Sequence, residues 1–286
     1  MSEPINNMIN KLSSLSLRHS NDLFGGEGSG LDVIEVKHAN CTATIALQGA
    51  QLLSFQATNR EPLLWLSPNA GFVSGKAVRG GIPLCAPWFG PHPNDPNKPQ
   101  HGFARNHNWI LMKAEEDQAA VRLHFQYSSD DHQQILFPWP LRLDLEMTLG
   151  EGLELRFSAT NEGNHSHGDM PFTFALHSYF PVDDCREVSV HGLKEVQTFN
   201  GEVDKLLTQV PNQQTIHNTG AEISITGDHC PSAIVWNPGA EKAAALKDLG
   251  EAHYHTFVCV ERGAAGTDAW TLKPGETRQA TLSLYR

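Results

Sequence analysis

Short runs in which hydrophobic and polar residues alternate recur along most of the chain. A period of two residues is typical of β-strands with one buried face, and turn residues separate the runs. In chain order the runs are LDVIEV, ATIAL, QLLSFQA, LLWLS, VRLHFQY, LRLDLEM, LELRFSAT, FTFALHSYF, AEISIT, AIVWN, TFVCVE and ATLSLYR. Their number and spacing predict an all-β fold, built as a sandwich or a barrel.

Helical spacing of apolar residues is found in two places. It predicts a short amphipathic helix over residues 4–18, which a Gly-rich link follows up to residue 30. One more short helix is expected at EKAAALKDL, residues 241–249. Because the strands do not alternate with helices of about 10–15 residues, a parallel α/β sheet is disfavoured. We therefore divide the chain into an N-terminal appendage, residues 1–30, and a β-domain, residues 31–286.

The composition is that of a folded chain with a small-molecule partner. Of 286 residues, 40% are hydrophobic and 19% are charged, a profile that excludes disorder over most of the length. The formal net charge is −11, from 21 basic and 32 acidic residues. Nucleic-acid-binding domains need a basic surface, so we expect no nucleic-acid partner. A small anion would have to be held by a few local arginines.

The cysteines and the apolar runs predict the compartment. The five cysteines are far apart, odd in number and without a C-x-x-C pair, which argues against a disulfide framework and a zinc ribbon. No apolar run approaches the ~18 residues of a membrane span, and residues 1–30 lack the apolar region of a signal peptide. We expect a cytoplasmic protein with no membrane partner. Since no interface stripe is evident, we also expect a monomer.

The segment KAVRGGIPLCAPWFGPHPNDPNKPQHGFARNHNW, residues 76–109, is predicted to be a long ordered loop. Loops of this length are usually functional or disordered, and its aromatic and apolar content favours order. Arg79 precedes Gly80-Gly81, where backbone amides could approach an anion, and Arg105 lies near the end of the segment. The two guanidinium groups could converge on one phosphate or carboxylate. Alternatively, both arginines are structural and bind backbone carbonyls.

Two strand-like runs each present a candidate acid or base on the face opposite their core residues. In FTFALHSYF, alternation places His177 with Tyr179, away from the phenylalanines, as on a ligand-lining face. In HYHTFVCVERG, it places Glu261 with Cys259, away from the valines. The alternatives are a surface-strand histidine and a structural ion pair between Glu261 and Arg262.

Two H-x-H pairs raise the question of a metal site. His165 and His167 form one, and His253 and His255, which the strand pattern places on the face of Glu261, form the other. On an extended strand His255 and Glu261 would lie about 20 Å apart, too far to share a metal ion. We therefore expect no metal. The sequence also lacks the serine-hydrolase, Walker A and dinucleotide-binding motifs.

Five motifs, in this order and spacing, resemble those of the hexose-6-phosphate mutarotases. They are RGGIPLCAPWFG (79–90), PQHGFARNHNW (99–109), ALHSYF (175–180), IVWNP (234–238) and VCVERG (258–263). These enzymes form the glucose-6-phosphate 1-epimerase branch of the aldose 1-epimerase, or galactose mutarotase-like, superfamily, and the similarity spans residues 31–286. The resemblance implies a large antiparallel β-sandwich of the supersandwich type, with few short helices and the site on a concave face.

The resemblance also implies residue roles and a reaction. His177 matches the family's general acid and Glu261 its general base. Four residues match positions that contact the phosphorylated sugar: Arg79, His101, Arg105 and Asp204. The implied enzyme is an isomerase that interconverts the α and β anomers of a hexose 6-phosphate by ring opening and reclosure, without a cofactor. The first candidate substrate is glucose 6-phosphate. From ordinary pKa values we expect Glu261 to be ionised and His177, beside a carboxylate, to be protonated.

The sequence departs from the family pattern at three positions, and other functions stay open. Ala86, Gly239 and Arg262 stand where relatives often have a bulkier residue, an aromatic residue and a proline, which could change the pocket rim. The main alternative is a noncatalytic protein that binds sugars or sugar phosphates on the same scaffold. An epimerase for an unphosphorylated sugar and a metal-dependent cupin-like enzyme are two others.

Overall fold

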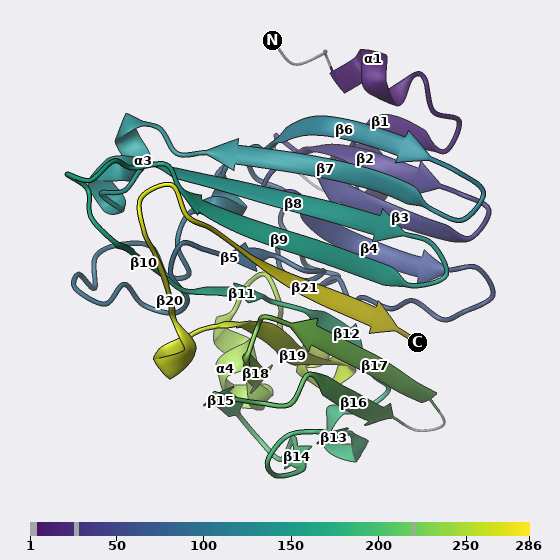
Figure 1. The fold of residues 1–286 in the computed structure, drawn as a ribbon. Helices are drawn as coiled ribbons and strands as arrows, with labels where there is room; N and C mark the ends of the chain where they lie inside the picture. The colour runs from purple at the N-terminus through teal and green to yellow at the C-terminus, as the bar shows by residue number, and fades with distance from the viewer. Residues whose placement is uncertain (1–4, 26–28, 219–220) are drawn as a thin grey trace.

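The largest sheet contains nine strands and extends across the molecule (Figure 1). The computed structural model describes residues 5–25, 29–218 and 221–286. Every neighbouring pair in this sheet is antiparallel. In spatial order its strands are β14 (Gln197–Thr198), β13 (Ser189–His191), β16 (Gln213–Asn218), β17 (Ala221–Asp228), β21 (Thr277–Tyr285), β9 (Leu153–Asn161), β8 (Leu141–Leu149), β7 (Val121–Ser128) and β6 (Ile110–Glu116).

Two smaller sheets pack against the nine-stranded sheet, so the predicted all-β sandwich is confirmed. The first contains β1 (Leu15–His19), β2 (Asp32–Lys37), β3 (Cys41–Ala46) and β4 (Gln51–Ala57). The second is ordered β15 (Val203–Leu207), β18 (Ser232–Asn237), β19 (Phe257–Ala264), β11 (Phe174–Leu176) and β5 (Leu84–Cys85), and β12 (Tyr179–Pro181) also pairs with β19. A separate two-stranded ladder is formed by β10 (Met170–Phe172) and β20 (Trp270–Leu272).

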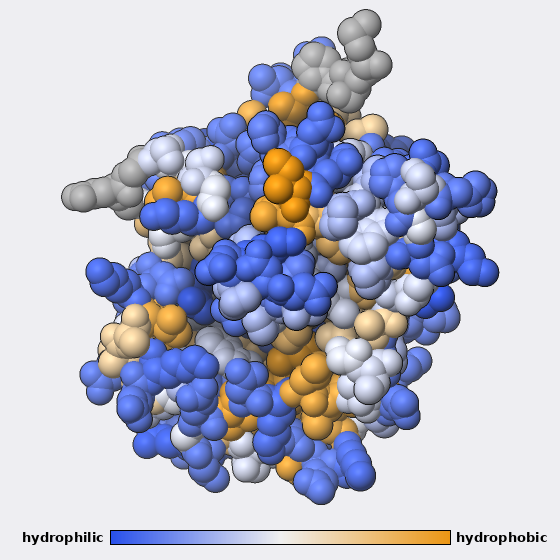
Figure 2. Space-filling model, turned by 90° about the vertical axis from the view of Figure 1, so that its left-hand side faces the viewer, coloured by the Kyte–Doolittle hydropathy of each residue, from blue (hydrophilic) through white to orange (hydrophobic). Residues whose placement is uncertain are grey.

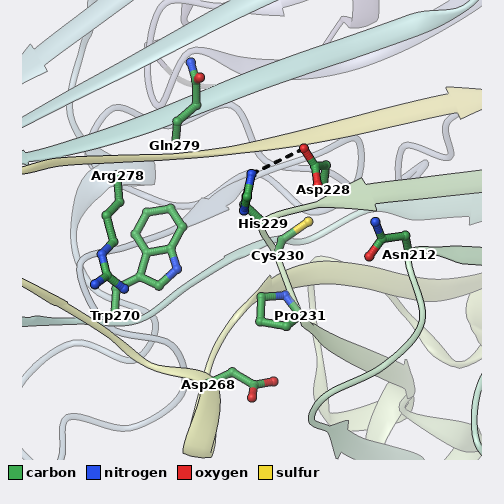
Figure 3. A pocket seen from close by; sticks show the side chains of 9 residues that line it. All are labelled: Asn212, Asp228, His229, Cys230, Pro231, Asp268, Trp270, Arg278 and Gln279. Carbon is green, nitrogen blue, oxygen red and sulfur yellow. Dashed lines mark ion pairs between the residues drawn. The ribbon is translucent and has the colours of Figure 1, made fainter.

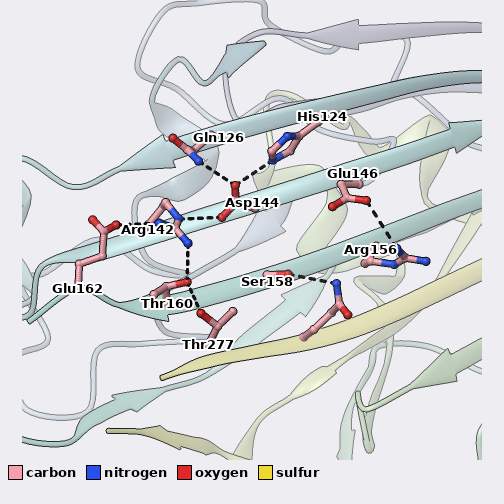
Figure 4. A network of polar contacts seen from close by, with 11 residues as sticks. His124, Gln126, Arg142, Asp144, Glu146, Arg156, Ser158, Thr160, Glu162 and Thr277 are labelled. Carbon is pink, nitrogen blue, oxygen red and sulfur yellow. Dashed lines mark hydrogen bonds and ion pairs between the residues drawn. The ribbon is translucent and has the colours of Figure 1, made fainter. Parts of the chain in front are cut away.

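The apolar faces of the sheets form one shared core, whereas hydrophilic residues predominate on the molecular face shown in Figure 2. Along β8 every second residue from Leu141 to Leu149 is buried, as the alternation predicts. These side chains cluster with Ile34 of the four-stranded sheet and Val258 of the six-stranded sheet. The opposite face of β7, β8 and β9 carries a polar network around Asp144 (Figure 4). Burial of a large apolar side chain contributes about 1.5–3 kcal/mol, so the pattern determines which face turns inward.

The helices are few and short, as predicted. Among the described residues they are α1 (Ile5–Ile9), α2 (Ser20–Phe24), α3 (Asp131–Leu136) and α4 (Gly239–Ala245), with 3-10 helices η1 (Ala104–Asn106), η2 (Cys185–Glu187), η3 (Glu251–Thr256) and η4 (Gly266–Asp268). None of these helices has the length and apolar content to cross a membrane. The helix predicted over residues 241–249 is α4, which ends at Ala245 and is followed by a turn that buries Leu249.

The N-terminal segment differs from its prediction. The helix expected over residues 4–18 begins within the described residues at Ile5 and ends at Ile9, and Leu15–His19 form strand β1. Because β1 pairs with β2, part of the appendage is an edge strand of a sheet. LSLRH has a period of two, but the helical spacing of the residues before it conceals that signal. Residues 26–28 of the Gly-rich link lie outside the described residues, and the division at residue 30 stays a prediction.

One other predicted run is not a strand, and a second is a strand only in part. LLWLS, residues 63–67, has a single bridge and is otherwise irregular, with the Trp65 amide donating to the carbonyl of Tyr179. Residues 253–256 belong to η3, so HYHTFVCVERG is extended only from Phe257 onward. Apolar or aromatic content without a neighbouring strand in register does not make a strand.

Candidate active site

Strand register brings His177 and Glu261 together. β11 and β12 both pair with β19, and the two residues that link them, His177 and Ser178, lie outside the ladder. Leu176 lies opposite Arg262, so His177, the next residue along the chain, is level with Glu261. Alternation places both side chains on the same face, and they meet there.

The His177 and Glu261 side chains form a buried contact. Nε2 of His177 lies 3.3 Å from Oε1 of Glu261, and 10% of the histidine and 1% of the glutamate side chain are exposed. Nδ1 of His177 and Oε2 of Glu261 are buried without a hydrogen-bond partner among the described residues. Leaving a buried polar atom unpaired costs about 1–3 kcal/mol, and native proteins contain few such atoms. Two of them on one contact indicate a site for a polar ligand.

Aromatic rings fix the orientation of His177. Its ring stacks on Tyr179 with centroids 4.7 Å apart, and Trp236 of β18 meets it edge-on at 5.9 Å. His101 lies edge-on at 6.2 Å. Because three rings surround the imidazole, packing sets the direction of its nitrogen atoms before any ligand binds.

Burial shifts the pKa values of this pair toward the uncharged forms. The pKa of His177 lies well below its ordinary value because of burial first, and then because of His101 and Arg105. The pKa of Glu261 lies well above its ordinary value, again because of burial first, and then because of Asp204. Both directions run against the expectation of a charged His177 beside an ionised Glu261, because burial disfavours each charged form.

Residues 76–109 form an ordered loop at the site, as predicted, with only β5 and η1 as regular elements. The amide of Gly81 is not free for the contact with an anion that the sequence suggests. The Gly81 amide donates to the carbonyl of Trp65, and a Cβ at Gly81 would lie 2.1 Å from the carbonyl oxygen of Leu52. Gly81 also has a φ of +63°, so glycine is required there for close backbone packing.

Arg79 reaches the site, but a carboxylate holds it. Its Nε donates to Oδ2 of Asp248 at 3.0 Å, and one terminal nitrogen donates to Oδ1 at 3.2 Å. The other terminal nitrogen donates to the Tyr179 hydroxyl at 3.4 Å. The guanidinium carbon lies 6.0 Å from the ring centroid of Trp236. Arg79 is thus bound to a side-chain carboxylate, not to the backbone carbonyls considered above.

Arg105 and His101 enter the site from the end of the loop. A terminal nitrogen of Arg105 donates to the carbonyl of Gln100 at 3.1 Å, and its buried Nε has no partner among the described residues. Nδ1 of His101 accepts the amide hydrogen of Gly90 at 3.1 Å. Burial, and then Arg105, lower the pKa of His101 to about 3. His101 is therefore neutral near pH 7 and carries its proton on Nε2.

All six residues implied by the resemblance line one pocket of about 350 Å³, a volume within the range of small-molecule sites. They are Arg79, His101, Arg105, His177, Asp204 and Glu261. Asp204 enters from β15, opposite Trp236 in the neighbouring strand. Asp248 and Lys242 also line the pocket, and sequence reasoning missed both. Neither lies in a recognisable motif, and the pattern of α4 does not tell which of its residues face a pocket.

Arg262 does not pair with Glu261, so the structural ion pair considered for Glu261 is excluded. Arg262 is fully buried on the opposite face of β19. Its guanidinium donates to uncharged acceptors: the carbonyls of Cys230, Pro211 and Asn212 and the side-chain oxygen of Gln214. Neither Arg262 nor the other two departures from the family pattern, Ala86 and Gly239, line the pocket.

The two H-x-H pairs do not form a ligand cluster. His253 and His255 lie in η3, not on a strand with Glu261. Nδ1 of His167 lies 2.9 Å from the side-chain oxygen of Asn164. Within residues 5–25, 29–218 and 221–286, no group of three or more His, Cys, Asp or Glu side chains is arranged to hold a metal ion. The cupin-like alternative has no geometric support in this part of the chain.

A second hollow, of about 730 Å³, lies elsewhere on the surface (Figure 3). Its lining residues are Asn212, Asp228, His229, Cys230, Pro231, Asp268, Trp270, Arg278 and Gln279. Its one drawn ion pair joins Nε2 of His229 to Oδ2 of Asp228 at 3.6 Å, and both side chains are mostly exposed. Of the lining side chains, none has a buried polar atom without a partner in the described structure. We therefore place the candidate site at the first pocket.

Comparison with known proteins finds relatives over most of the chain. A family model described as aldose 1-epimerase matches residues 32–216 and 197–285. A protein from Salmonella typhimurium is 34% identical, over 89% of this chain and 91% of its own. Proteins from Escherichia coli strain K12 and Cenchrus ciliaris are also 34% identical, over 82% and 90% of this chain and 84% and 85% of their own. All three carry the provisional name glucose-6-phosphate 1-epimerase.

Solved structures share the fold. The crystal structure of YeaD from Salmonella typhimurium, provisionally named a mutarotase, has a TM-score of 0.85 at 32% identity and covers 96% of this chain and 94% of its own. The crystal structure of HI1317 has a TM-score of 0.74 at 27% identity and covers 96% of both chains. The sandwich predicted from the strand pattern and the motifs is therefore the fold of these relatives.

Proposed function

Because the chain belongs to the aldose 1-epimerase family and is therefore an isomerase, we propose that it interconverts the α and β anomers of a hexose 6-phosphate. Glucose 6-phosphate is the first candidate, since the relatives at 34% identity are named for it. The observation that supports the proposal most directly is the buried contact between His177 and Glu261, which leaves one polar atom unpaired on each side chain.

Anomer exchange needs one base and one acid. In the proposed reaction Glu261 takes the proton of the anomeric hydroxyl, the bond between C1 and the ring oxygen breaks, and His177 gives a proton to that oxygen. The open-chain aldehyde rotates about its C1–C2 bond. The hydroxyl then attacks the other face of C1 and both protons return, so that no proton or electron is gained or lost overall.

Substrate binding sets the protonation that this reaction needs. In the free pocket burial raises the pKa of Glu261 and lowers that of His177, so both groups are shifted toward their uncharged forms. A sugar hydroxyl that donates a hydrogen bond to Oε2 favours the carboxylate form. The proton then passes across the 3.3 Å contact to His177. The base and the acid are thus formed together, with the sugar in place.

The remaining predicted residues bind the sugar phosphate. Arg79 and Arg105 supply guanidinium donors, His101 supplies a neutral N–H, and the carboxylate of Asp204 accepts hydrogen bonds from sugar hydroxyls. A hydrogen bond to a charged group contributes about 1.5–3 kcal/mol, so a few local donors suffice in a protein of net charge −11. That the enzyme acts as a monomer in the cytoplasm stays a prediction from the sequence.

Exchange NMR between the two anomers of glucose 6-phosphate tests this function. Free glucose is measured in a parallel sample, and spontaneous mutarotation in buffer alone is the blank. We expect faster exchange of the phosphorylated sugar, unchanged by a chelator. Equal acceleration of both sugars would instead favour an epimerase for unphosphorylated sugars, and no acceleration of either would contradict the proposal.

A further inference from the structure

Three basic side chains line the pocket, and their partners differ. Arg79 is held by Asp248 through two hydrogen bonds, of 3.0 and 3.2 Å. The Lys242 ammonium lies 2.6 Å from a carboxylate oxygen of Glu202. Arg105 donates to a backbone carbonyl and has no carboxylate partner among the described residues. Of these three side chains, Arg105 is the one whose charge no directly bonded carboxylate balances within the described residues.

Asp248 is a fixed partner of Arg79. It lies in the turn after α4, where the Ser67 hydroxyl donates to its carbonyl at 2.7 Å. The Asn69 side chain donates to the next carbonyl, that of Leu249, at 2.9 Å, and the Leu249 side chain is fully buried. Because the backbone is anchored on both sides, the Asp248 carboxylate is held against the guanidinium.

Arg79 keeps donors for a ligand although its charge is balanced. A guanidinium has five N–H groups. Two go to Asp248 and one goes to the Tyr179 hydroxyl, so two are left for a sugar oxygen. The side chains of Arg79 and Asp248 are 20% and 37% exposed, at the pocket wall. A neutral pair in this position can orient a sugar ring, but it adds little attraction for a phosphate dianion.

We infer that Asp248 determines specificity: it neutralises Arg79, so that Arg105 is the main anchor of the phosphate and Arg79 positions the sugar. The inference rests on the proposed function and gives different tasks to two arginines that the sequence motifs do not distinguish. It also limits the substrate to one anionic group. A second phosphate near Arg79 would meet the carboxylate of Asp248.

Calorimetric titration with inorganic phosphate tests this division. Asp248→Asn keeps an oxygen acceptor for Arg79 and removes the negative charge, so we expect phosphate to bind about tenfold more tightly. Arg105→Gln should weaken phosphate binding at least about tenfold, and Arg79→Gln less than about threefold. In the double variant of Asp248→Asn and Arg79→Gln the gain should disappear, because it depends on the freed guanidinium.

Glu162→Gln is the matched control. Glu162 pairs with Arg142 at 3.1 Å on the outer face of the large sheet (Figure 4), and its side chain is 38% exposed, as Asp248 is 37%. The two substitutions change the net charge equally, but only one touches the pocket. We expect unchanged phosphate affinity in Glu162→Gln. An equal gain in phosphate affinity in Glu162→Gln and Asp248→Asn, or weaker phosphate binding by Asp248→Asn, would overturn the inference.

Anomer exchange separates this inference from the proposed function. We expect Arg79→Gln to slow the exchange of glucose and glucose 6-phosphate by the same factor, and Arg105→Gln to slow only the phosphorylated sugar. If the wild-type enzyme does not accelerate glucose 6-phosphate exchange, the proposed function fails, and the inference with it. If it does, but Arg79→Gln loses phosphate binding as strongly as Arg105→Gln, the inference on Asp248 alone is wrong. Thermal unfolding of each variant checks that it is folded.

Discussion

Glu261 and Arg262 are neighbours on β19 and both are fully buried, on opposite faces of the strand. Glu261 contacts a single histidine and has one oxygen without a partner in the described structure. Each guanidinium nitrogen of Arg262, in contrast, donates to an oxygen atom. Burial raises the pKa of Glu261 and lowers that of Arg262, so each group is shifted toward its uncharged form.

The difference between these two residues separates a reactive group from a structural one. A buried polar group with all its hydrogen bonds made rigidifies its surroundings and has nothing left for a ligand. A buried group with an unpaired atom costs stability in the free protein and gains its missing partner only when a ligand binds. Hydrogen bonding around each group therefore tells more about its function than burial does.

The largest expected effect follows from Glu261→Gln. A positioned proton-transfer group accelerates a reaction by about 10²–10⁴-fold. We therefore expect the rate of anomer exchange to fall at least about a hundredfold in Glu261→Gln, and by a similar factor in His177→Asn. Near-normal exchange in either variant would exclude that residue as an acid or base.

The stability of Glu261→Gln should not fall. Because the pKa of Glu261 is raised on folding, the wild-type protein loses stability as the pH rises above the ordinary value of 4.5. Glutamine has no such loss, so at pH 7 the variant should be at least as stable as the wild type. Urea unfolding measures this, and a marked destabilisation would mean that the carboxylate is structural.

The next effect concerns the other face of the strand. Arg262→Met removes the donor of the Cys230 carbonyl and one of two donors of the Pro211 and Asn212 carbonyls, and we expect a loss of about 1–3 kcal/mol in the free energy of unfolding. Arg262→Lys keeps the charge but not the planar guanidinium group, so its free energy of unfolding should lie between those of the wild type and Arg262→Met. Urea unfolding followed by tryptophan fluorescence tests this, and an unchanged midpoint would show that Arg262 is not an anchor.

A smaller effect depends on pH. Burial lowers the pKa of His101 to about 3. Below about pH 6.5 this histidine is therefore protonated in the unfolded chain but stays neutral in the folded protein. Stability is thus lost as the pH falls from 6.5, and His101 accounts for about 2 kcal/mol between pH 7 and pH 5. His101→Asn removes this share and tolerates the local φ of 66°. Equal pH slopes of the wild type and the variant in urea unfolding would contradict the shift.

The smallest effect belongs to the outer face of the large sheet. Glu162 and Arg142 form a partly exposed ion pair there, at 3.1 Å. Such pairs contribute about 0–1 kcal/mol, so Glu162→Gln should change the free energy of unfolding by less than about 1 kcal/mol. A larger loss, measured by the same urea titration, would mean that the polar network around Asp144 supports the fold as strongly as Arg262 does.

The sequence predicts the fold best where alternation is strict. β7, β8 and β9 lie within one or two residues of their predicted bounds, because one face of each strand is buried over its whole length. LLWLS and residues 253–256 are not strands, because neither segment has a neighbouring strand in register. β15 and β16 were not predicted, since VDKLL and QQTIHN have little apolar alternation.

The site is predictable in its residues more than in its charges. Five of the six predicted residues lie in the ordered motifs, the sixth, Asp204, comes from a weaker match outside them, and all six line one pocket. The pairing of Arg79 with Asp248 joins residues 169 positions apart in the sequence, and no local pattern reports it. The protonation of His177 and Glu261 depends on burial by three strands and a loop, which ordinary pKa values do not contain.

The anomer-exchange rate of glucose 6-phosphate per folded molecule, measured in parallel for the wild type, Glu261→Gln and Arg262→Met, tests the central claim most directly. We expect that Glu261→Gln stays folded and loses at least about a hundredfold in rate, whereas Arg262→Met loses stability and keeps the rate of its folded fraction. Similar rate losses in the two variants, or a normal rate in Glu261→Gln, would contradict it.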